Sequence, residues 1–265
     1  MTPVLEAREV TVSFGGVRAV VDVDVTVEPG QLLGLIGPNG AGKTTFIDAI
    51  SGFVRYSGNV LLDGRELAGL PPHERARRGL TRTWQSIELF DDLTVRENIA
   101  VAAQRPSALT TVREVVTGSS GAAPELDEAL SLFGLHGKTE AMPAELSQAD
   151  RKLVGVARAL AAHPRLLCLD EPAAGLDAAG SEELGAHLRE IADRGTALLL
   201  VDHDMGLVLS ISDYVVVLEF GKVIARGKPD EVRRDPQVVA AYLGSAAAEL
   251  APEALSAPEQ AGEGR

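Results

Sequence analysis

The stretch Gly37-Pro-Asn-Gly-Ala-Gly-Lys-Thr44 decides how this chain folds. It matches the pattern G-x-x-x-x-G-K-[S/T] at every fixed position. The apolar run Gln31–Ile36 precedes it, and Phe46, Ile47 and Ile50 follow on one helix face. An ordinary glycine-rich turn is the alternative. A strand before the stretch and a helix after it instead favour a strand–loop–helix unit of a parallel sheet.

The glycines of this stretch let the backbone curl so that successive N–H groups face one point, and the following helix adds the positive end of its dipole. Such a loop binds nucleotide phosphates. Lys43 can reach the β- and γ-phosphates as a point charge, and the Thr44 hydroxyl can coordinate Mg²⁺. The residues that we expect at the nucleotide are Asn39, Gly40, Ala41, Gly42, Lys43, Thr44 and Thr45.

A second motif, Leu166-Leu-Cys-Leu-Asp-Glu171, is an apolar run that ends in two carboxylates. A parallel strand delivers such residues to the carboxyl edge of its sheet, where α/β proteins bind ligands. We expect Asp170 to hold Mg²⁺ through water and Glu171 to orient or deprotonate the attacking water. An acidic pair after a strand is most often a solvated loop. Together with the phosphate-binding stretch, it indicates nucleoside triphosphate hydrolysis, while Cys168 is expected to fill the core.

The rest of the pattern is that of an α/β chain. Alternation over the first thirty residues predicts a strand with one apolar face, made by Val21, Val23, Val25 and Val27. Further strands are expected at Asn59–Leu62, Ala197–Val201 and Tyr214–Leu218, and a helix at Ala178–Ala192. The charges of residues 75–78 are expected on a solvated helix face.

The domain organisation follows from where apolar residues occur. Residues 95–160 are mostly helical in pattern and contain a loop-like Ser/Gly stretch at 118–121. We expect one α/β domain over residues 1–245, with a helical subdomain over about 90–160. The tail, residues 246–265, has almost no large apolar side chains and is expected to be disordered.

Charge and composition exclude several classes of function. The net charge of −13 argues against nucleic acid as a partner, because neutralising phosphates needs clustered Lys and Arg. A single cysteine fits a reducing cytoplasm. No stretch approaches the roughly 20 apolar residues of a membrane-spanning helix, and no signal peptide is evident at the N-terminus. A membrane role is therefore expected only through a partner chain.

Further landmarks resemble the ABC ATPase family. Gln85 in Thr81-Arg-Thr-Trp-Gln85 looks like the glutamine that links the metal site to the permease contact. His203 looks like the switch histidine that touches the γ-phosphate, and Phe14 stands where an aromatic stacks on adenine. Ala174-Gly-Leu-Asp177 looks like the loop that crosses to the partner subunit. The resemblance implies a P-loop (RecA-like) ATPase core with an N-terminal antiparallel β subdomain and a helical subdomain.

A narrower resemblance is to the branched-chain amino-acid uptake ATPases. It is carried by Phe14-Gly-Gly16, Gly79–Gln85, Leu89–Asn98 and Ala241-Tyr-Leu-Gly244. The group implies an importer of branched-chain amino acids or a related small polar solute. Related systems for urea, aromatic acids or lipopolysaccharide are alternatives, because the ATPase residues do not contact the cargo.

One segment departs from the family. The signature, usually Leu-Ser-Gly-Gly-Gln, reads Leu146-Ser-Gln-Ala-Asp150 here. The resemblance implies that Ser147 contacts the nucleotide bound by a partner subunit. Ser147-x-x-Asp150 is also a capping-box pattern that could simply begin a helix, and the two interpretations can coexist.

The resemblance also implies the ligands and partners. ATP and Mg²⁺ are expected, with Thr44, Gln85 and Asp170 at the metal and with Glu171, His203 and Lys43 catalytic. The expected partners are integral-membrane permease subunits, a second ATPase subunit packed head to tail and, indirectly, a solute-binding protein. The chain would lie at the cytoplasmic face of the membrane.

Two other functions remain open at this point. A soluble ABC protein of DNA repair or translation is disfavoured, because 265 residues leave no room for a coiled-coil insertion or a second ATPase domain. A regulatory nucleotide-binding subunit that scarcely hydrolyses ATP is disfavoured by Lys43, Asp170 and Glu171 and is favoured by the altered signature.

Overall fold

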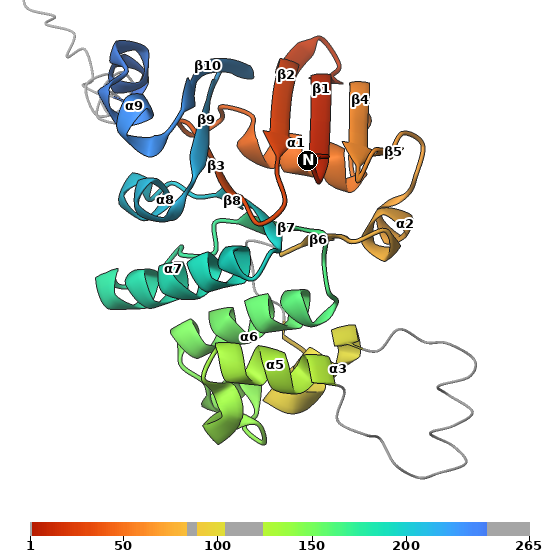
Figure 1. Ribbon diagram of the computed structural model, residues 1–265, viewed down its shortest axis with the longest axis vertical. Coiled ribbons are helices and arrows are strands. Elements are labelled where there is room, and N and C mark those ends of the chain that lie inside the picture. Colours follow the sequence, from red (N-terminus) through yellow and green to blue (C-terminus); the bar gives the residue numbers. More distant parts are fainter. Residues whose placement is uncertain (1, 84–88, 104–123, 243–265) are drawn as a thin grey trace, which may run out of the picture.

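The computed structural model describes residues 2–83, 89–103 and 124–242, and within these ranges the chain forms two sheets and a set of helices (Figure 1). The first sheet is antiparallel and runs in the order β2 (Val17–Val27), β1 (Leu5–Phe14), β4 (Ser57–Leu62) and β5 (Arg65–Glu66). The second runs in the order β10 (Lys222–Gly227), β9 (Tyr214–Glu219), β3 (Leu32–Ile36), β8 (Ala197–Val201), β7 (Leu166–Asp170) and β6 (Leu80–Arg82).

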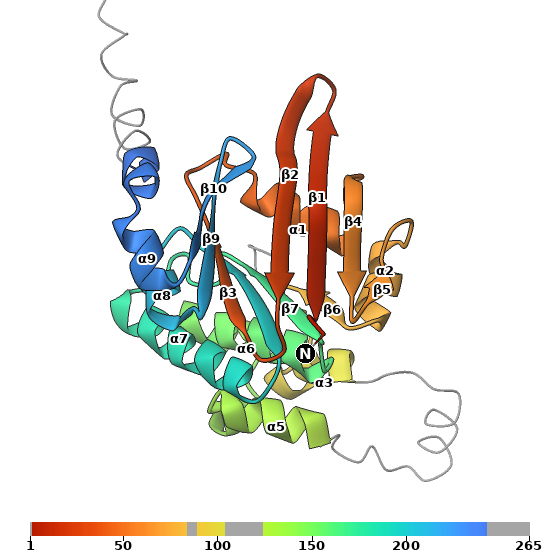
Figure 2. The ribbon, with the colours of Figure 1, turned by 45° about the horizontal axis from the view of Figure 1, so that its top comes forward.

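The helices lie on both sides of the second sheet. They are α1 (Lys43–Ser51), α2 (Pro72–Arg77), α3 (Val95–Ala103), α5 (Pro124–Leu132), α6 (Gln148–Ala161), α7 (Ala178–Asp193), α8 (Met205–Ile211) and α9 (Pro229–Arg234). In both views α3, α5 and α6 lie together, away from the β1–β2 hairpin (Figures 1 and 2). No helix in the described part of the chain is long and apolar enough to cross a membrane.

Strand alternation divides the interior into two cores. In β3, Leu33 and Leu35 face a core shared with β1, β2, β4 and α1, whereas Leu32 and Ile36 face a core shared with α3 and α5 to α9. The same period of two divides β7 and β8. Both faces of the second sheet are therefore covered, which explains why its strands read as continuous apolar runs.

The parallel part of the second sheet brings together strands from distant parts of the sequence. From β9 to β6 every neighbouring pair is parallel, and only β10 runs antiparallel at the edge. Asp170 at the end of β7 lies in register with Val201 at the end of β8. The carboxyl ends of β3, β7 and β8 consequently meet along one edge.

The predicted strands and helix are confirmed within one or two residues at each end. The strand predicted at Asn59–Leu62 begins two residues earlier, as β4, and the helix predicted at Ala178–Ala192 extends by one residue, as α7. The α/β fold with an N-terminal antiparallel sheet is also confirmed. The division into domains stays a prediction, and the loop at 118–121 and the tail at 246–265 lie outside the described residues.

Cys168 fills the core, as expected. It lies in the middle of β7 with no exposed surface. Burial raises the pKa of its thiol to about 12, so the group stays protonated at neutral pH and is not a nucleophile in the folded chain.

The prediction of a solvated face at residues 75–78 is wrong for Arg75. This side chain is 3% exposed, and its guanidinium donates to the carbonyl oxygens of Leu70, Ala49 and Ile50 at 2.8–2.9 Å. Ala49 and Ile50 are in the last turn of α1, at the negative end of the helix dipole, where a cation is favourable. Arg75 therefore stabilises the end of the helix that carries Lys43.

We predict that Arg75→Met lowers the free energy of unfolding by about 3 kcal/mol, because it removes three hydrogen bonds from a buried guanidinium to carbonyl oxygens. Urea denaturation of the purified chain measures this. Arg77→Met is the matched control: Arg77 is exposed on the same helix, and we expect a change within about 0.5 kcal/mol. Equal losses in the two variants would contradict a capping role for Arg75.

Candidate ATP-binding and hydrolysis site

The phosphate-binding loop joins β3 to α1 and is packed too closely for side chains. Gly37 and Gly42 have φ values of 150° and 101°. A Cβ atom on Gly37 would lie 2.1 Å from the carbonyl oxygen of Leu218, and one on Gly42 would lie 2.4 Å from that of Ala19. The loop thus needs glycine both for its backbone conformation and for its contacts with β9 and β2.

Lys43 begins α1 and is 6% exposed. Its ammonium donates to the carbonyl oxygens of Gly37 and Pro38, at 2.6 and 3.0 Å. Burial lowers the pKa of Lys43, while the negative charges of Glu171 and Asp170 act in the opposite direction. The side chain is thus folded back over its own loop, where phosphate oxygens can replace the two carbonyl groups.

Asp170 and Thr44 come together as the sequence predicts. Asp170 is 2% exposed, and its Oδ1 accepts a hydrogen bond of 3.4 Å from the Thr44 hydroxyl. Its Oδ2 accepts one of 2.9 Å from Arg82. Burial raises the pKa of Asp170 above its usual value, against the opposing effect of the Arg82 guanidinium. The buried carboxylate of Asp170 thus contacts α1 through one oxygen and the Arg82 guanidinium through the other.

Glu171 follows β7 in an uncommon backbone conformation. Its φ is 50°, in the left-handed region, and its N–H donates to the carbonyl oxygen of Val201 at 2.7 Å. A non-glycine residue in this region costs on the order of 1 kcal/mol, so the surrounding structure must hold it there. The bond to the end of β8 does this, and it fixes where the Glu171 side chain starts.

His203 lies two residues after the end of β8, beside an aspartate whose role the sequence did not reveal. Asp202 has no exposed surface, and its carboxylate accepts hydrogen bonds from the N–H groups of Ala173 and Asp204, at 3.1 and 3.0 Å. His203 Nδ1 lies 3.3 Å from Asp202 Oδ1, with its side chain 60% exposed. The only sequence signal for Asp202 is its place directly after an apolar strand.

Lys152 is a second residue that the sequence analysis missed. It lies in α6, is 5% exposed, and donates to the carbonyl oxygen of Pro172 at 2.8 Å. Burial lowers its pKa, and the charges of Asp202 and Glu171 oppose this. The ammonium thus ties α6 to the segment just after the acidic pair.

The segment Leu146–Asp150 begins a helix, so the capping interpretation is confirmed. Ser147 is the N-cap of α6, and its Oγ accepts from the Asp150 N–H at 3.1 Å and donates to Asp150 Oδ2 at 2.8 Å. Lys138 binds Asp150 Oδ1 at 2.6 Å. Partial burial acts to raise the pKa of Asp150, but the hydrogen bonds from Lys138 and Ser147 outweigh it, and the pKa is below its usual value.

Gln148 lies beside the loop that is predicted to reach a partner subunit. A Cβ atom added at Gly175 of this loop would lie 2.7 Å from Gln148 Nε2, so the Gln148 amide leaves no room there for a side chain. The signature segment is thus bound to Lys138 on one side, and Gln148 lies close to the Gly175 loop on the other.

The remaining predicted residues lie around the loop or outside the described residues. Asn39, Gly40 and Thr44 are exposed, Thr45 is half-buried and Ala41 is buried. Phe14 ends β1 with its side chain 53% exposed, which leaves the ring accessible. Gln85 lies outside the described residues.

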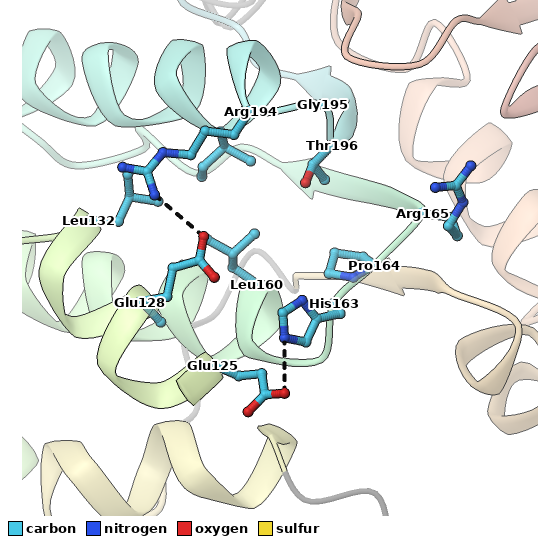
Figure 3. Close-up of a pocket in the computed structure, with 12 residues that line it drawn as sticks. Glu125, Glu128, Leu132, Leu160, His163, Pro164, Arg165, Arg194, Gly195 and Thr196 are labelled. Carbon is cyan, nitrogen blue, oxygen red and sulfur yellow. Dashed lines mark hydrogen bonds and ion pairs between the residues drawn. The ribbon is translucent and has the colours of Figure 1, made fainter. Parts of the chain in front are cut away.

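A cavity of about 320 Å³ lies elsewhere in the molecule (Figure 3). Two ion pairs lie at it, between His163 and Glu125 at 3.7 Å and between Arg194 and Glu128 at 3.4 Å. Its lining includes residues just before β7 and β8, at the amino ends of these strands. A five-residue strand, about 16 Å long, therefore separates this cavity from the carboxyl edge that carries Asp170.

Comparison with known proteins identifies the family of this chain. The profile of the family described as ABC transporter matches residues 20–174, and that of the branched-chain amino acid ATP-binding cassette transporter matches residues 222–248. The chain belongs to the ABC transporter family. It is an ATP-binding subunit that hydrolyses ATP for a transporter, and such subunits work with membrane permease subunits.

Several relatives of this ABC ATPase cover nearly its whole length. The branched-chain amino acid transport protein BraF of Pseudomonas aeruginosa is 38% identical, covering 92% of this chain and 99% of the relative. LivG of Escherichia coli K12 is 36% identical with the same coverage. The lipopolysaccharide export protein LptB of Haemophilus influenzae is 34% identical, covering 91% and 97%.

Solved structures of ABC transporter cassettes share the fold of this ABC ATPase. A nucleotide-free ATP-binding cassette has a TM-score of 0.77 and 28% identity, covering 91% of this chain and 98% of that one. The ADP conformation of the cassette MJ1267 has the same score and identity, covering 92% and 100%. The P-loop ABC ATPase fold expected from the sequence is thus confirmed.

Proposed function

We propose that this ABC ATPase drives the import of branched-chain amino acids or of a related small polar solute. The support is the match of residues 222–248 to the branched-chain amino acid cassette family, together with relatives of that name at 36–38% identity. Relatives named for lipopolysaccharide export, at 33–34% identity, make export of a lipid the alternative. Systems for urea or aromatic acids remain further alternatives.

The observation that carries ATP turnover at this site is the grouping of Lys43, Asp170, Glu171 and His203 at the carboxyl ends of β3, β7 and β8. Lys43 exchanges its two carbonyl partners for the β- and γ-phosphate oxygens. Its positive charge then offsets the negative charge of the bound nucleotide.

Thr44 and Asp170 supply the oxygen ligands that Mg²⁺ prefers. Their oxygens lie 3.4 Å apart, and Mg²⁺ usually takes one or two protein ligands in addition to water and substrate phosphates. When bound with the nucleotide, the ion neutralises charge on the transferred phosphate group. We assign Gln85 to the same site from the family resemblance alone.

Glu171 acts on the attacking water, and His203 contacts the γ-phosphate. Asp202 lies beside His203 Nδ1 and is itself held by two backbone N–H groups, so it can orient the imidazole. Phe14, exposed at the end of β1, stacks on adenine.

The partners follow from the same proposal. The chain binds integral-membrane permease subunits at the cytoplasmic face of the membrane, and a solute-binding protein acts on it only through them. A second ATPase subunit packs head to tail, so that Ser147 of this chain contacts the nucleotide held by that subunit. This second subunit is a different chain or another copy of this one.

We predict that Lys43→Ala weakens ATP binding at least about tenfold, whereas Glu171→Gln leaves binding within about twofold and lowers turnover by about 10²–10³-fold. The lysine holds phosphate charge in the ground state, and the glutamate acts on the attacking water. Titration with a fluorescent ATP analogue and a phosphate-release assay measure the two effects. Equal losses of ATP binding in Lys43→Ala and Glu171→Gln would contradict these roles. If the wild-type chain hydrolysed ATP no faster than Glu171→Gln, the regulatory alternative would be favoured instead.

The cargo is tested in cells that lack this chain. We predict that they lose uptake of radiolabelled leucine, isoleucine and valine, and that the wild-type chain restores it while Lys43→Ala does not. The variant is the matched control, because it keeps the fold and contacts of the subunit but not ATP binding. Unchanged uptake of all three amino acids would exclude them as the main cargo.

When the second subunit is a different chain with the usual signature, the altered signature of this chain predicts an asymmetric pair of sites. Gln148 and Ala149 carry side chains where the family has glycine, and the Ser147 hydroxyl already donates to Asp150. Lys138 neutralises much of the Asp150 charge, so crowding is the larger expected effect. Because a signature serves the nucleotide of the other subunit, the defect falls on the partner's site.

We predict that Gln148→Gly, Ala149→Gly and Asp150→Gln together raise turnover at the partner's site roughly tenfold, because they restore close backbone donors. The assay uses assembled transporter in which Lys43→Ala silences this chain's own site. In the reverse arrangement, with the partner's site silenced, the triple variant should change nothing. No gain in the first arrangement would mean that Leu146–Asp150 is already a working signature.

A further inference from the structure

Arg82 connects two acidic groups at the edge of the nucleotide site. It ends β6, where it lies in register with Cys168 on β7, and its side chain is 6% exposed. Its Nη2 donates to Asp170 Oδ2 at 2.9 Å, and its Nη1 pairs with Asp48 Oδ1. One buried guanidinium therefore joins the end of β7 to helix α1.

The two oxygens of Asp170 have different partners because of this contact. Oδ2 is bound by Arg82, so Oδ1 is the oxygen that meets the Thr44 hydroxyl, at 3.4 Å. Asp48 and Thr44 are four residues apart on α1 and thus lie on one helix face. Arg82 consequently holds both the carboxylate of Asp170 and the helix that carries Thr44.

We propose that Arg82 is a positioning residue for the metal site: it keeps Asp170 Oδ1 turned toward Thr44 and keeps α1 tied to the end of β7. The inference rests on the proposed function, in which Thr44 and Asp170 bind Mg²⁺ with the nucleotide. Arg82 does not touch the metal or the phosphates in this assignment, and it acts through Asp170.

The geometry requires arginine rather than any cation. The planar guanidinium sends one N–H group to each of two carboxylates on different elements, whereas the ammonium of lysine is a flexible point charge. The guanidinium also lies 6.0 Å from the centre of the Phe53 ring, which restricts its plane further. Burial strengthens the contact with Asp170, because both side chains are nearly inaccessible and water does not compete for it, whereas Asp48 is partly exposed.

A charge effect and a positioning effect have opposite signs here. Removing a cation beside a metal site strengthens the attraction of Mg²⁺, since the local charge becomes more negative. Loss of positioning weakens Mg²⁺ binding, typically by about 10–100-fold when the group that orients a metal ligand is removed. Arg82→Lys keeps the charge and loses the geometry, and Arg82→Gln loses both.

The test compares binding of a fluorescent ATP analogue to the purified full chain in EDTA and in Mg²⁺, with Mn²⁺ binding by electron paramagnetic resonance as a readout independent of turnover. We expect affinities in EDTA within about twofold of wild type for both variants. Mg²⁺ raises the affinity of the wild-type chain for the nucleotide. This increase should be about tenfold smaller in Arg82→Lys, and it should be reduced at least as much in Arg82→Gln. Arg77→Lys, on the exposed face of α2, is the control and should match wild type.

Asp48→Asn tests the same link from the other side and serves if an Arg82 variant does not fold. It leaves the Arg82–Asp170 contact in place and weakens the tie to α1, so we expect a smaller loss, about threefold, in Mg²⁺ only. Its effect should not add to that of Arg82→Lys, because the two residues form one unit.

Three results would overturn the proposal: equal losses in EDTA and Mg²⁺, unchanged Mg²⁺ affinity in Arg82→Lys, or tighter Mg²⁺ binding in Arg82→Gln. The first would show a general structural role, the second no role, and the third a charge effect only. Failure of the proposed function looks different, because wild type itself would then gain no affinity from Mg²⁺ and Asp170→Asn would bind nucleotide like wild type.

Discussion

The close packing of the phosphate-binding loop is the constraint on which the rest of the structure depends. At Gly37 the loop backbone touches β9, and at Gly42 it touches β2, with no space for a Cβ atom at either place. Gly221, in the turn between β9 and β10, completes the contact by donating to the carbonyl oxygen of Ala41 and accepting from the N–H group of Val21. The antiparallel sheet and the parallel sheet are therefore joined at the loop itself, and the position of Lys43 follows from the packing of both.

Buried charge is the second ordering principle of the site. Lys43, Arg82, Lys152, Asp170 and Asp202 are nearly inaccessible to water, and isolated charges of this kind would be strongly unfavourable. Each is held by the opposite charge or by backbone groups: the cations bind carbonyl oxygens or carboxylates, and Asp202 binds N–H groups. Such groups keep fixed directions before the nucleotide arrives, so little reorganisation is needed during turnover.

Local patterns allowed the sheet, the loop and the acidic pair to be predicted, because apolar runs and glycine spacing directly reflect backbone conformation. The residues that were missed, Arg75, Arg82, Lys152 and Asp202, are charged side chains whose partners lie on other elements. Periodicity separates apolar from polar positions but does not show which charged side chain is buried. Burial depends on which other helices and strands pack against that side chain in the folded chain. The pairing of Asp150 with Lys138 was beyond prediction for the same reason, although the capping by Ser147 is local and was readable.

The strand order has a consequence for how the chain is made. β3, which leads into the phosphate-binding loop, pairs on its two sides with β8 and β9, near the other end of the chain. During synthesis, β3 and α1 leave the ribosome long before β8 and β9 have been made. Such distant pairing makes folding slow and leaves apolar surface exposed in the meantime. The phosphate-binding loop and its flanking strand thus stay unpaired in the nascent chain until β8 and β9 have been synthesised. Binding by chaperones is most useful in this interval, because the apolar strand is exposed.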